Sequence, residues 1–296
     1  MSAVLQANGL GKRYGRSWAL SECTLAVPAG KVVALVGPNG AGKTTLLQPS
    51  VGLLQPDTGS ITVLGGRPGK TAEQLARVGF VAQDVPTYAN LSVREHLRFG
   101  AWMNPGWDAG LAEDRIACLG LDPHQKAAQL SGGQRAQLAL TLAVAKRPEL
   151  LVLDEPVASL DPLARREFLQ GLMEIVAEHG ANVILSSHLV ADLERVCDYL
   201  VVLIGSRVQV AGGIEELLAT HHRLTGPRRD HTTLPKDQLI VLESHTDRQS
   251  TLVVRSDYPV LDRSWSVEQL SLEDLVLAYM TRAAQVVRQP KLEVHR

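Results

Sequence analysis

The sequence predicts an α/β fold in which helices cover a mostly parallel sheet. Short apolar runs at residues 31–36, 150–153 and 182–185 are typical of strands that are buried on both faces. A helical pattern follows each run, as residues 163–178 show. Because strands that alternate with helices pair in parallel through crossover connections, we expect one α/β core over residues 1–220.

A second segment departs from this alternation. Residues 84–135 are largely helical in pattern, with amphipathic stretches at 92–103 and 109–119. This composition predicts a helical lobe inserted into the α/β core.

The chain changes in composition after residue 220. Residues 221–236 contain glycine, proline and clustered histidine and arginine without an apolar period, so we expect a solvated linker. The cluster matches no zinc-binding spacing. Strand-like runs at 239–242 and 251–254 and an amphipathic helix at 272–287 then predict a small α+β extension over residues 237–296.

Composition excludes several classes of protein. The 30 basic and 31 acidic residues give a net charge of −1, so no global basic field attracts nucleic acid. The three cysteines are far apart and odd in number, which favours reduced thiols in the cytosol. No apolar run reaches the length of a membrane span, and no secretion leader is expected. Any membrane part must therefore come from another chain.

A glycine-rich turn after the first buried run fits the P-loop pattern G-x-x-x-x-G-K-[ST]. Its glycines allow backbone N–H groups to surround phosphate oxygens, and the helix that follows adds its positive dipole end. Lys43 supplies a charge to the β- and γ-phosphates, and the Thr44 hydroxyl ligates Mg²⁺. The predicted ATP-binding residues here are Gly37, Pro38, Asn39, Gly40, Ala41, Gly42, Lys43, Thr44 and Thr45.

Pro49 lies about seven residues inside the helix that the P-loop begins. Proline removes one backbone hydrogen bond and clashes with the preceding turn, at a cost of about 3 kcal/mol in a helix interior. We therefore predict a kink or an early end near Gln48.

Two carboxylates end the apolar run at 150–153. If this strand lies beside the P-loop, Asp154 reaches the Mg²⁺ shell, and Glu155 polarises a water for attack on the γ-phosphate. The alternative is an ordinary acidic turn. Residues 130–134 read Leu-Ser-Gly-Gly-Gln and precede a helical run, which predicts either an anion site or a plain helix cap.

These motifs occur together in an order that resembles the ATP-binding cassette (ABC) ATPase family. The resemblance covers about residues 4–220, and Leu-Ser-Gly-Gly-Gln is its most specific element. It implies a P-loop NTPase fold of the ABC type, with an antiparallel β subdomain beside the parallel sheet. The motifs follow one another as residues 37–45, Gln83, residues 130–134, residues 154–156, Asp161 and His188.

The resemblance implies further roles within one subunit. Tyr14 stacks on adenine, Gln83 contacts Mg²⁺ and the attacking water, and His188 hydrogen-bonds the γ-phosphate. Each residue also has a plainer interpretation. Tyr14 could be a half-buried aromatic of a strand, Gln83 a polar loop residue, and His188 a histidine of the core or of a helix cap. Because all the expected catalytic residues are present, namely Lys43, Gln83, Glu155 and His188, the resemblance implies ATP hydrolysis.

It also implies a second ABC ATPase subunit, as a homodimer or a heterodimer. Residues Ser131, Gly132, Gly133 and Gln134 close over ATP held by the partner's P-loop. Asp161 links the two sites, although it precedes a proline and also fits a helix N-cap.

One set of motifs predicts one cassette that energises a separate integral membrane permease from the cytoplasmic face of the membrane. Residues 84–103, with Pro86 and Tyr88, are the expected docking surface. The terminal helix and residues 103–108 resemble bacterial export ATPases. An uptake subunit and a soluble regulatory or resistance ATPase stay open as alternatives, whereas a small GTPase is excluded because no Asn-Lys-x-Asp motif occurs.

Overall fold

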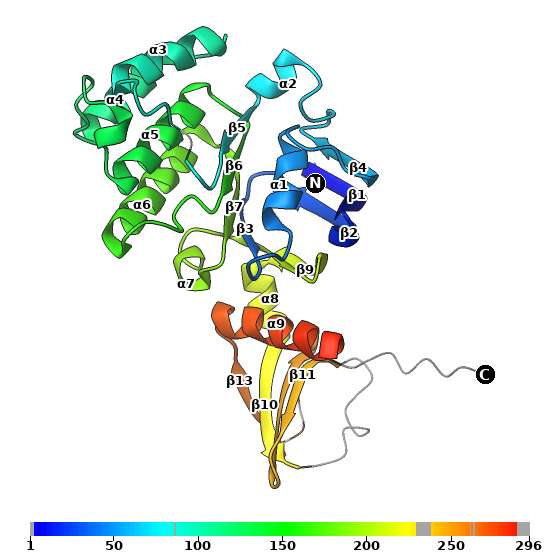
Figure 1. The fold of residues 1–296 in the computed structure, drawn as a ribbon. Helices are drawn as coiled ribbons and strands as arrows, with labels where there is room; N and C mark the ends of the chain where they lie inside the picture. The colour runs from blue at the N-terminus through cyan, green and yellow to red at the C-terminus, as the bar shows by residue number, and fades with distance from the viewer. Residues whose placement is uncertain (1–2, 86, 229–237, 261, 263, 289–296) are drawn as a thin grey trace.

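The computed structural model describes residues 3–85, 87–228, 238–260, 262 and 264–288. Its centre is a six-stranded sheet with the order β5-β6-β7-β3-β8-β9 (Figure 1). Neighbouring strands are parallel except β8 and β9, which confirms the mostly parallel sheet. The strands are β3 (Val32–Val36), β5 (Val78–Val81), β6 (Leu150–Asp154), β7 (Asn182–Ser187), β8 (Tyr199–Ile204) and β9 (Arg207–Gly213).

The sheet is buried on both faces, which explains why its strands are apolar throughout. In β3, Ala34 and Val36 belong to the hydrophobic cluster that includes Leu172 of α6 (Pro162–His179). Val33 and Leu35 point the other way, into a cluster with α1 and the N-terminal strands. Side chains alternate between the faces of a strand, so both faces need apolar residues.

A three-stranded antiparallel sheet with the order β2-β1-β4 packs on the second face. Its strands are β1 (Ala3–Tyr14), β2 (Ser17–Pro28) and β4 (Thr58–Val63). Figure 1 shows this sheet and α1 on one side of the six-stranded sheet, with α5 and α6 on the other. The antiparallel β subdomain that the resemblance implied is therefore present.

The predicted helical lobe is also present, with a small core of its own around Val93, Ile116 and Leu138. Ser92 and Asp108 cap its first two long helices through their side-chain oxygens, as such residues do at helix N-termini. The helices of the lobe are α3 (Val93–Met103), α4 (Ala109–Cys118) and α5 (Gly132–Ala145), with a 3₁₀ turn at Ala127–Gln129. The short helix α2 (Ala72–Ala76) precedes β5 and lies outside the lobe.

Helix α1 (Lys43–Ser50) follows the P-loop and ends one residue after Pro49. Past the proline, the N–H of Val51 bonds to the carbonyl of Gln48 and the N–H of Gly52 to that of Pro49. These i to i+3 contacts tighten the last turn instead of continuing the α-helix. The predicted early end of this helix is confirmed.

The predicted linker begins with a strand, which corrects that prediction for residues 221–227. Strand β10 (His221–Pro227) lies inside a four-stranded sheet with the order β11-β12-β10-β13. The remaining elements are α7 (Val190–Leu193), α8 (Ile214–Thr220), β11 (Leu239–His245), β12 (Gln249–Arg255), β13 (Ser266–Gln269) and α9 (Leu272–Arg288). His231 and Arg229 of the predicted cluster lie outside the described residues.

Helix α9 lies between this sheet and the α/β core (Figure 1). It contacts β11 on one side and α7, α8 and β8 on the other. Its buried residues, such as Leu272 and Val276, belong to the same hydrophobic cluster as the core. Across the described segments, no helix is both long enough and apolar enough to cross a lipid bilayer.

Polar residues in β10 are satisfied by tertiary partners. The side chain of His221 is fully buried, and its two ring nitrogens lie 2.7 Å from the carbonyl oxygen of Leu217 and 3.0 Å from the Tyr279 hydroxyl. Arg223 pairs with Asp274 of α9 at 2.9 Å. The missing apolar period therefore reflects a strand that is held partly by polar contacts with a distant helix.

His221 should make stability fall in acid. Burial lowers the pKa of His221 below its ordinary value of 6.5, against a smaller opposite effect of its hydrogen bond to Leu217. The unfolded chain therefore binds a proton more readily, and stability drops as the pH falls below about 6.5. Urea unfolding between pH 7.5 and 5 measures how the free energy of unfolding changes with pH. This dependence should be weaker for His221→Asn, whereas His124→Gln, which changes an exposed histidine, should keep the dependence of the parent chain.

Candidate functional site

The P-loop connects β3 to α1 and needs glycine at two positions for steric reasons. A Cβ on Gly37 would lie 2.1 Å from the carbonyl oxygen of Leu203, and one on Gly42 would lie 2.3 Å from that of Ala19. Gly42 also has φ +104°, a conformation that side chains rarely adopt. The loop therefore packs directly on neighbouring backbone, so that a side chain at either position would displace it.

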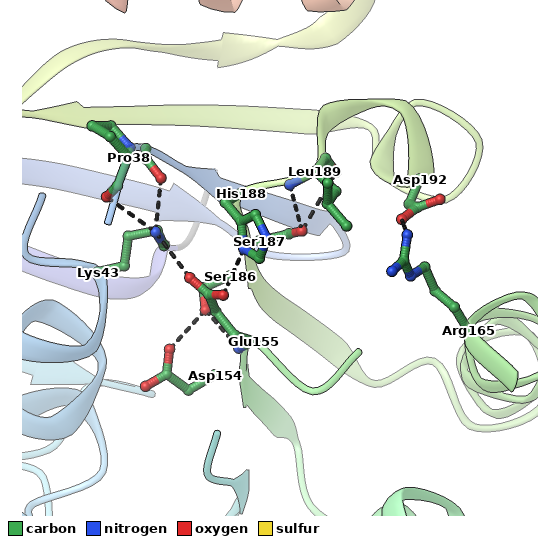
Figure 2. A network of polar contacts seen from close by, with 11 residues as sticks. Pro38, Lys43, Asp154, Glu155, Arg165, Ser186, Ser187, His188, Leu189 and Asp192 are labelled. Atoms are coloured by element: carbon green, nitrogen blue, oxygen red, sulfur yellow. Dashed lines mark hydrogen bonds and ion pairs between the residues drawn. The ribbon is translucent and has the colours of Figure 1, made fainter. Parts of the chain in front are cut away.

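Lys43 is the first residue of α1 and is only 5% exposed. Its Nζ donates to the carbonyl oxygens of Gly37 at 2.7 Å and Pro38 at 3.3 Å. It also forms an ion pair with Oε1 of Glu155 at 2.9 Å. The ammonium group thus lies at the mouth of the P-loop, beside the carboxylate that the sequence predicts as the base (Figure 2).

Asp154 is the last residue of β6, and Glu155 follows it. In the sheet, β7 lies between β6 and β3, the strand that leads into the P-loop. Ser186 of β7 joins the two residues: its Oγ donates to Oδ1 of Asp154 at 2.7 Å and accepts from the backbone N–H of Glu155 at 2.8 Å. Glu155 has φ +46°, which is uncommon for a residue with a side chain. Such backbone strain persists where surrounding contacts fix it, and it is concentrated at functional sites.

His188 follows β7 and contacts the same carboxylate. Its Nδ1 lies 2.7 Å from Oε2 of Glu155, whose side chain is 92% buried, so Lys43 and His188 engage the two oxygens separately (Figure 2). Burial alone raises the pKa of Glu155, but hydrogen bonds from Lys43 and His188 outweigh it and lower the pKa. The carboxylate is therefore ionised at neutral pH, as a proton acceptor must be.

Two further predicted residues are exposed groups at the ends of strands. Tyr14 ends β1 with 53% of its surface exposed, and Lys12 Nζ lies 6.0 Å from its ring centroid. Gln83 is exposed in the turn that follows β5. Both are free to receive a ligand.

The residues Ser131–Gln134 lie apart from the P-loop, at the N-terminus of α5 in the helical lobe. Ser131 and Gln134 form a reciprocal capping box, in which each side chain bonds the backbone N–H of the other. Asp161 caps α6 with its own carboxylate alone, because Oδ1 accepts from the N–H groups of Leu163 and Ala164 at 3.0 Å. Both predicted cap roles are thus observed, and the described chain joins neither segment to Lys43 by a hydrogen bond or ion pair.

The predicted metal ligands have suitable chemistry for Mg²⁺. Thr44, Gln83 and Asp154 offer a hydroxyl, an amide oxygen and a carboxylate, and hard oxygen donors of this kind suit the ion. The contact with Ser186 occupies Oδ1 of Asp154 and leaves Oδ2 for a metal or its water. Among the described residues, no group of three or more His, Cys, Asp or Glu side chains could hold a metal ion.

Sequence reasoning missed Ser186 and the direct pairing of Lys43 with Glu155. The signal for Ser186 is a small polar residue at the buried end of a strand, in register with Asp154. The fold and these contacts define a P-loop nucleotide-binding domain.

Comparison with known proteins identifies the family. A family model described as "ABC transporter" matches residues 20–158. The Nod factor export ATP-binding protein I of Cupriavidus pinatubonensis is 34% identical over 226 residues, which cover 74% of this chain and 69% of that protein. The chain therefore belongs to the family of ABC transporter ATP-binding proteins, which confirms the resemblance.

Other relatives agree on the family and differ in their transport direction. The sulfate/thiosulfate import ATP-binding protein CysA of Mycobacterium bovis is 37% identical over 206 residues, or 68% of this chain. The matched region spans 59% of that relative's length. A solved structure of an ATP-binding subunit of an ABC transporter aligns with a TM-score of 0.65 and 30% identity, over 73% of this chain and 92% of that one.

Proposed function

We propose that this chain is the ATP-hydrolysing subunit that energises a membrane permease. One observation carries the proposal: an ionised, buried Glu155 lies within hydrogen-bond distance of both Lys43 and His188 at the mouth of the P-loop. ATP hydrolysis needs a charge on the γ-phosphate and a base for the attacking water, and this arrangement offers both.

The residues then have distinct tasks. The P-loop N–H groups and Lys43 hold the β- and γ-phosphates, so Lys43 must exchange Glu155 for phosphate oxygens when ATP binds. Glu155 then orients the water and accepts its proton, while His188 hydrogen-bonds the γ-phosphate. Mg²⁺ held through Thr44, Asp154 and Gln83 would neutralise charge on the phosphates. Tyr14 would stack on the adenine.

A second subunit would complete each site. The capping box occupies the N–H groups of Ser131 and Gln134 and leaves those of Gly132 and Gly133, in the first turn of α5, outside it. A helix N-terminus with such groups would suit phosphate held by another copy. Asp161 would lie at the same interface.

The first test is ATP-dependent dimerisation of purified Glu155→Gln, measured by size exclusion with and without Mg-ATP. We expect a dimer only with Mg-ATP, and a monomer again when Ser131→Arg is added. A protein that binds ATP but stays monomeric would contradict a homodimer and direct the search to a partner cassette from membranes.

The permease would dock on the helical lobe and the adjoining pocket. This pocket, of about 510 Å³, lies between the end of α1, strand β5 and α5, with Leu53, Phe80 and Leu142 in its wall. Large apolar side chains are exposed nearby in α3, including Trp102 at 79%. Exposed apolar surface of this kind marks sites of protein interaction. Tyr88 is exposed there too, whereas Pro86 lies outside the described residues.

Charge reversal on α3 should separate docking from nucleotide binding. Arg94→Glu with Arg98→Glu is expected to abolish co-purification with membranes while leaving ATP binding unchanged. Both side chains are exposed on α3, whereas α1, which begins with Lys43, lies on the other side of the central sheet (Figure 1). Arg248→Glu, on the exposed turn before β12, is the matched control. Membrane recovery equal to that of the control would contradict this docking surface.

For direction we propose export, with the chain bound to its permease on the cytoplasmic face of the membrane. The similarity to a Nod factor export protein over 69% of its length supports it. Uptake is the second candidate, because the CysA relatives carry import names. Deletion of the gene should increase drug or antibiotic sensitivity and leave sulfate uptake intact; loss of sulfate uptake would favour the import function instead.

A further inference from the structure

The segment that follows His188 is weakly held by its own backbone. Helix α7 contains only Val190–Leu193, and its N-cap residue, Leu189, offers no side-chain hydrogen bond. Short isolated helices are unstable in water, so contacts with the rest of the molecule must hold α7 in place. Because α7 begins two residues after His188, those contacts also determine where the imidazole lies.

The Ser187 hydroxyl accepts from the backbone N–H of Leu189 at 3.0 Å and donates to its carbonyl oxygen at 3.4 Å, which holds the turn locally. One guanidinium group adds polar support from another element. Arg165 of α6 donates from Nη1 to Oδ2 of Asp192 in α7 at 3.0 Å. From Nη2 it donates to the carbonyl oxygen of Leu160 at 3.3 Å. Figure 2 shows the Arg165–Asp192 pair beside the turn that carries His188.

This guanidinium therefore ties α7 to the loop 155–161. Arg165 holds the loop near its last residue, Asp161. The first residue of the loop, Glu155, contacts His188 directly. A guanidinium is planar and rigid, so two bonds from its two ends fix the separation of the elements they join. The side chains of Arg165 and Asp192 are 21% and 28% exposed, so solvent screens this pair less than the fully exposed pairs.

Apolar contacts hold α7 independently. Val190 and Leu193 belong to the main hydrophobic cluster, and α7 also contacts α9. Loss of the ion pair should therefore let α7 shift without unfolding, and His188 would move with it.

We propose that Arg165 and Asp192 are positioning residues that hold His188 in register with Glu155 for hydrolysis. This inference rests on the proposed ATPase function and on the role of His188 in it. Neither residue reaches the P-loop through a contact in the described chain, so they act through His188 and the loop 155–161.

Steady-state kinetics of the full chain test the proposal with Asp192→Asn and Arg165→Met. Small displacements of catalytic groups cost up to about 100-fold in rate, so we expect kcat to fall about tenfold for Asp192→Asn and further for Arg165→Met, which also loses the bond to Leu160. The KM for ATP should change less than about twofold, because neither side chain contacts the nucleotide.

Arg147→Met is the matched control, because it breaks an ion pair with Asp108 at 2.6 Å, before the start of β6 and thus at the opposite end of that strand from Glu155. It should lower thermal stability about as much as Asp192→Asn while keeping the parent kcat. If Arg165→Met fails to fold, Arg165→Lys, which keeps the charge but not the fork, should show the same loss of kcat.

A double-mutant cycle with His188→Ala separates positioning from a general structural effect. Asp192→Asn should have little further effect on kcat once His188 is absent. An equal loss in both backgrounds, or a parent-like kcat for Asp192→Asn, would overturn the proposal. A parent-like kcat for His188→Ala would instead show that the proposed catalytic role of His188 is wrong, and the positioning role would fall with it.

Discussion

Replacement of Glu155 by glutamine is expected to lower the rate of ATP hydrolysis at least about 100-fold, since a positioned general base contributes roughly 10²–10⁴-fold. The amide has nearly the shape of the carboxylate but cannot accept the proton of the attacking water. ATP binding should be retained or strengthened, because Lys43 no longer has to leave the ion pair that it forms with Glu155 at 2.9 Å. Phosphate release and equilibrium binding of ATP measure the two effects separately.

Glu149→Gln is the matched control for this experiment. Glu149 lies just before the other end of β6, where its carboxylate pairs with Arg77. Its replacement makes the same change of carboxylate to amide in a partly exposed ion pair, at the opposite end of the strand from Glu155, and should leave hydrolysis near the parent rate. Hydrolysis by Glu155→Gln at the rate of Glu149→Gln would show that Glu155 is not the base.

The central sheet and the P-loop were predictable because local sequence carries their physical requirements. Strands β3 and β6 are buried on both faces, so every residue in them is apolar apart from the terminal Asp154. The P-loop needs glycine where Gly37 and Gly42 approach other backbone, so sterics alone limit the choice of residue. In both places a few neighbouring residues decide the structure.

Strand β10 shows where such local reasoning fails. His221 and Arg223 look solvated in the sequence, yet their partners, Tyr279 and Asp274, lie on α9 at the end of the chain. A strand whose polar residues are paired by tertiary contacts carries no apolar period. The same limit applies to Ser186, because its role depends on the register between β6 and β7.

Lys43→Met is expected to abolish ATP binding and to destabilise the fold. The Glu155 side chain is 92% buried and would keep its negative charge without the lysine, and breaking one side of a buried ion pair costs about 3–5 kcal/mol. His188 still contacts Glu155, which places the expected loss at the lower end of that range. Urea unfolding at neutral pH and ATP binding by calorimetry measure the two losses.

A second substitution distinguishes the unpaired charge from lost packing. Lys43→Met combined with Glu155→Gln should regain most of the stability, since no charge is then left buried, but should not regain ATP binding. A surface pair such as Arg147–Asp108 should show only about 1 kcal/mol or less in the same assay. If the double variant were as unstable as Lys43→Met, the loss would come from packing of the lysine stem in the P-loop. Recovery of stability without ATP binding would show that the main loss in Lys43→Met comes from the unpaired buried charge of Glu155. In the parent chain the ion pair would then stabilise both buried charges, and ATP binding would have to separate them.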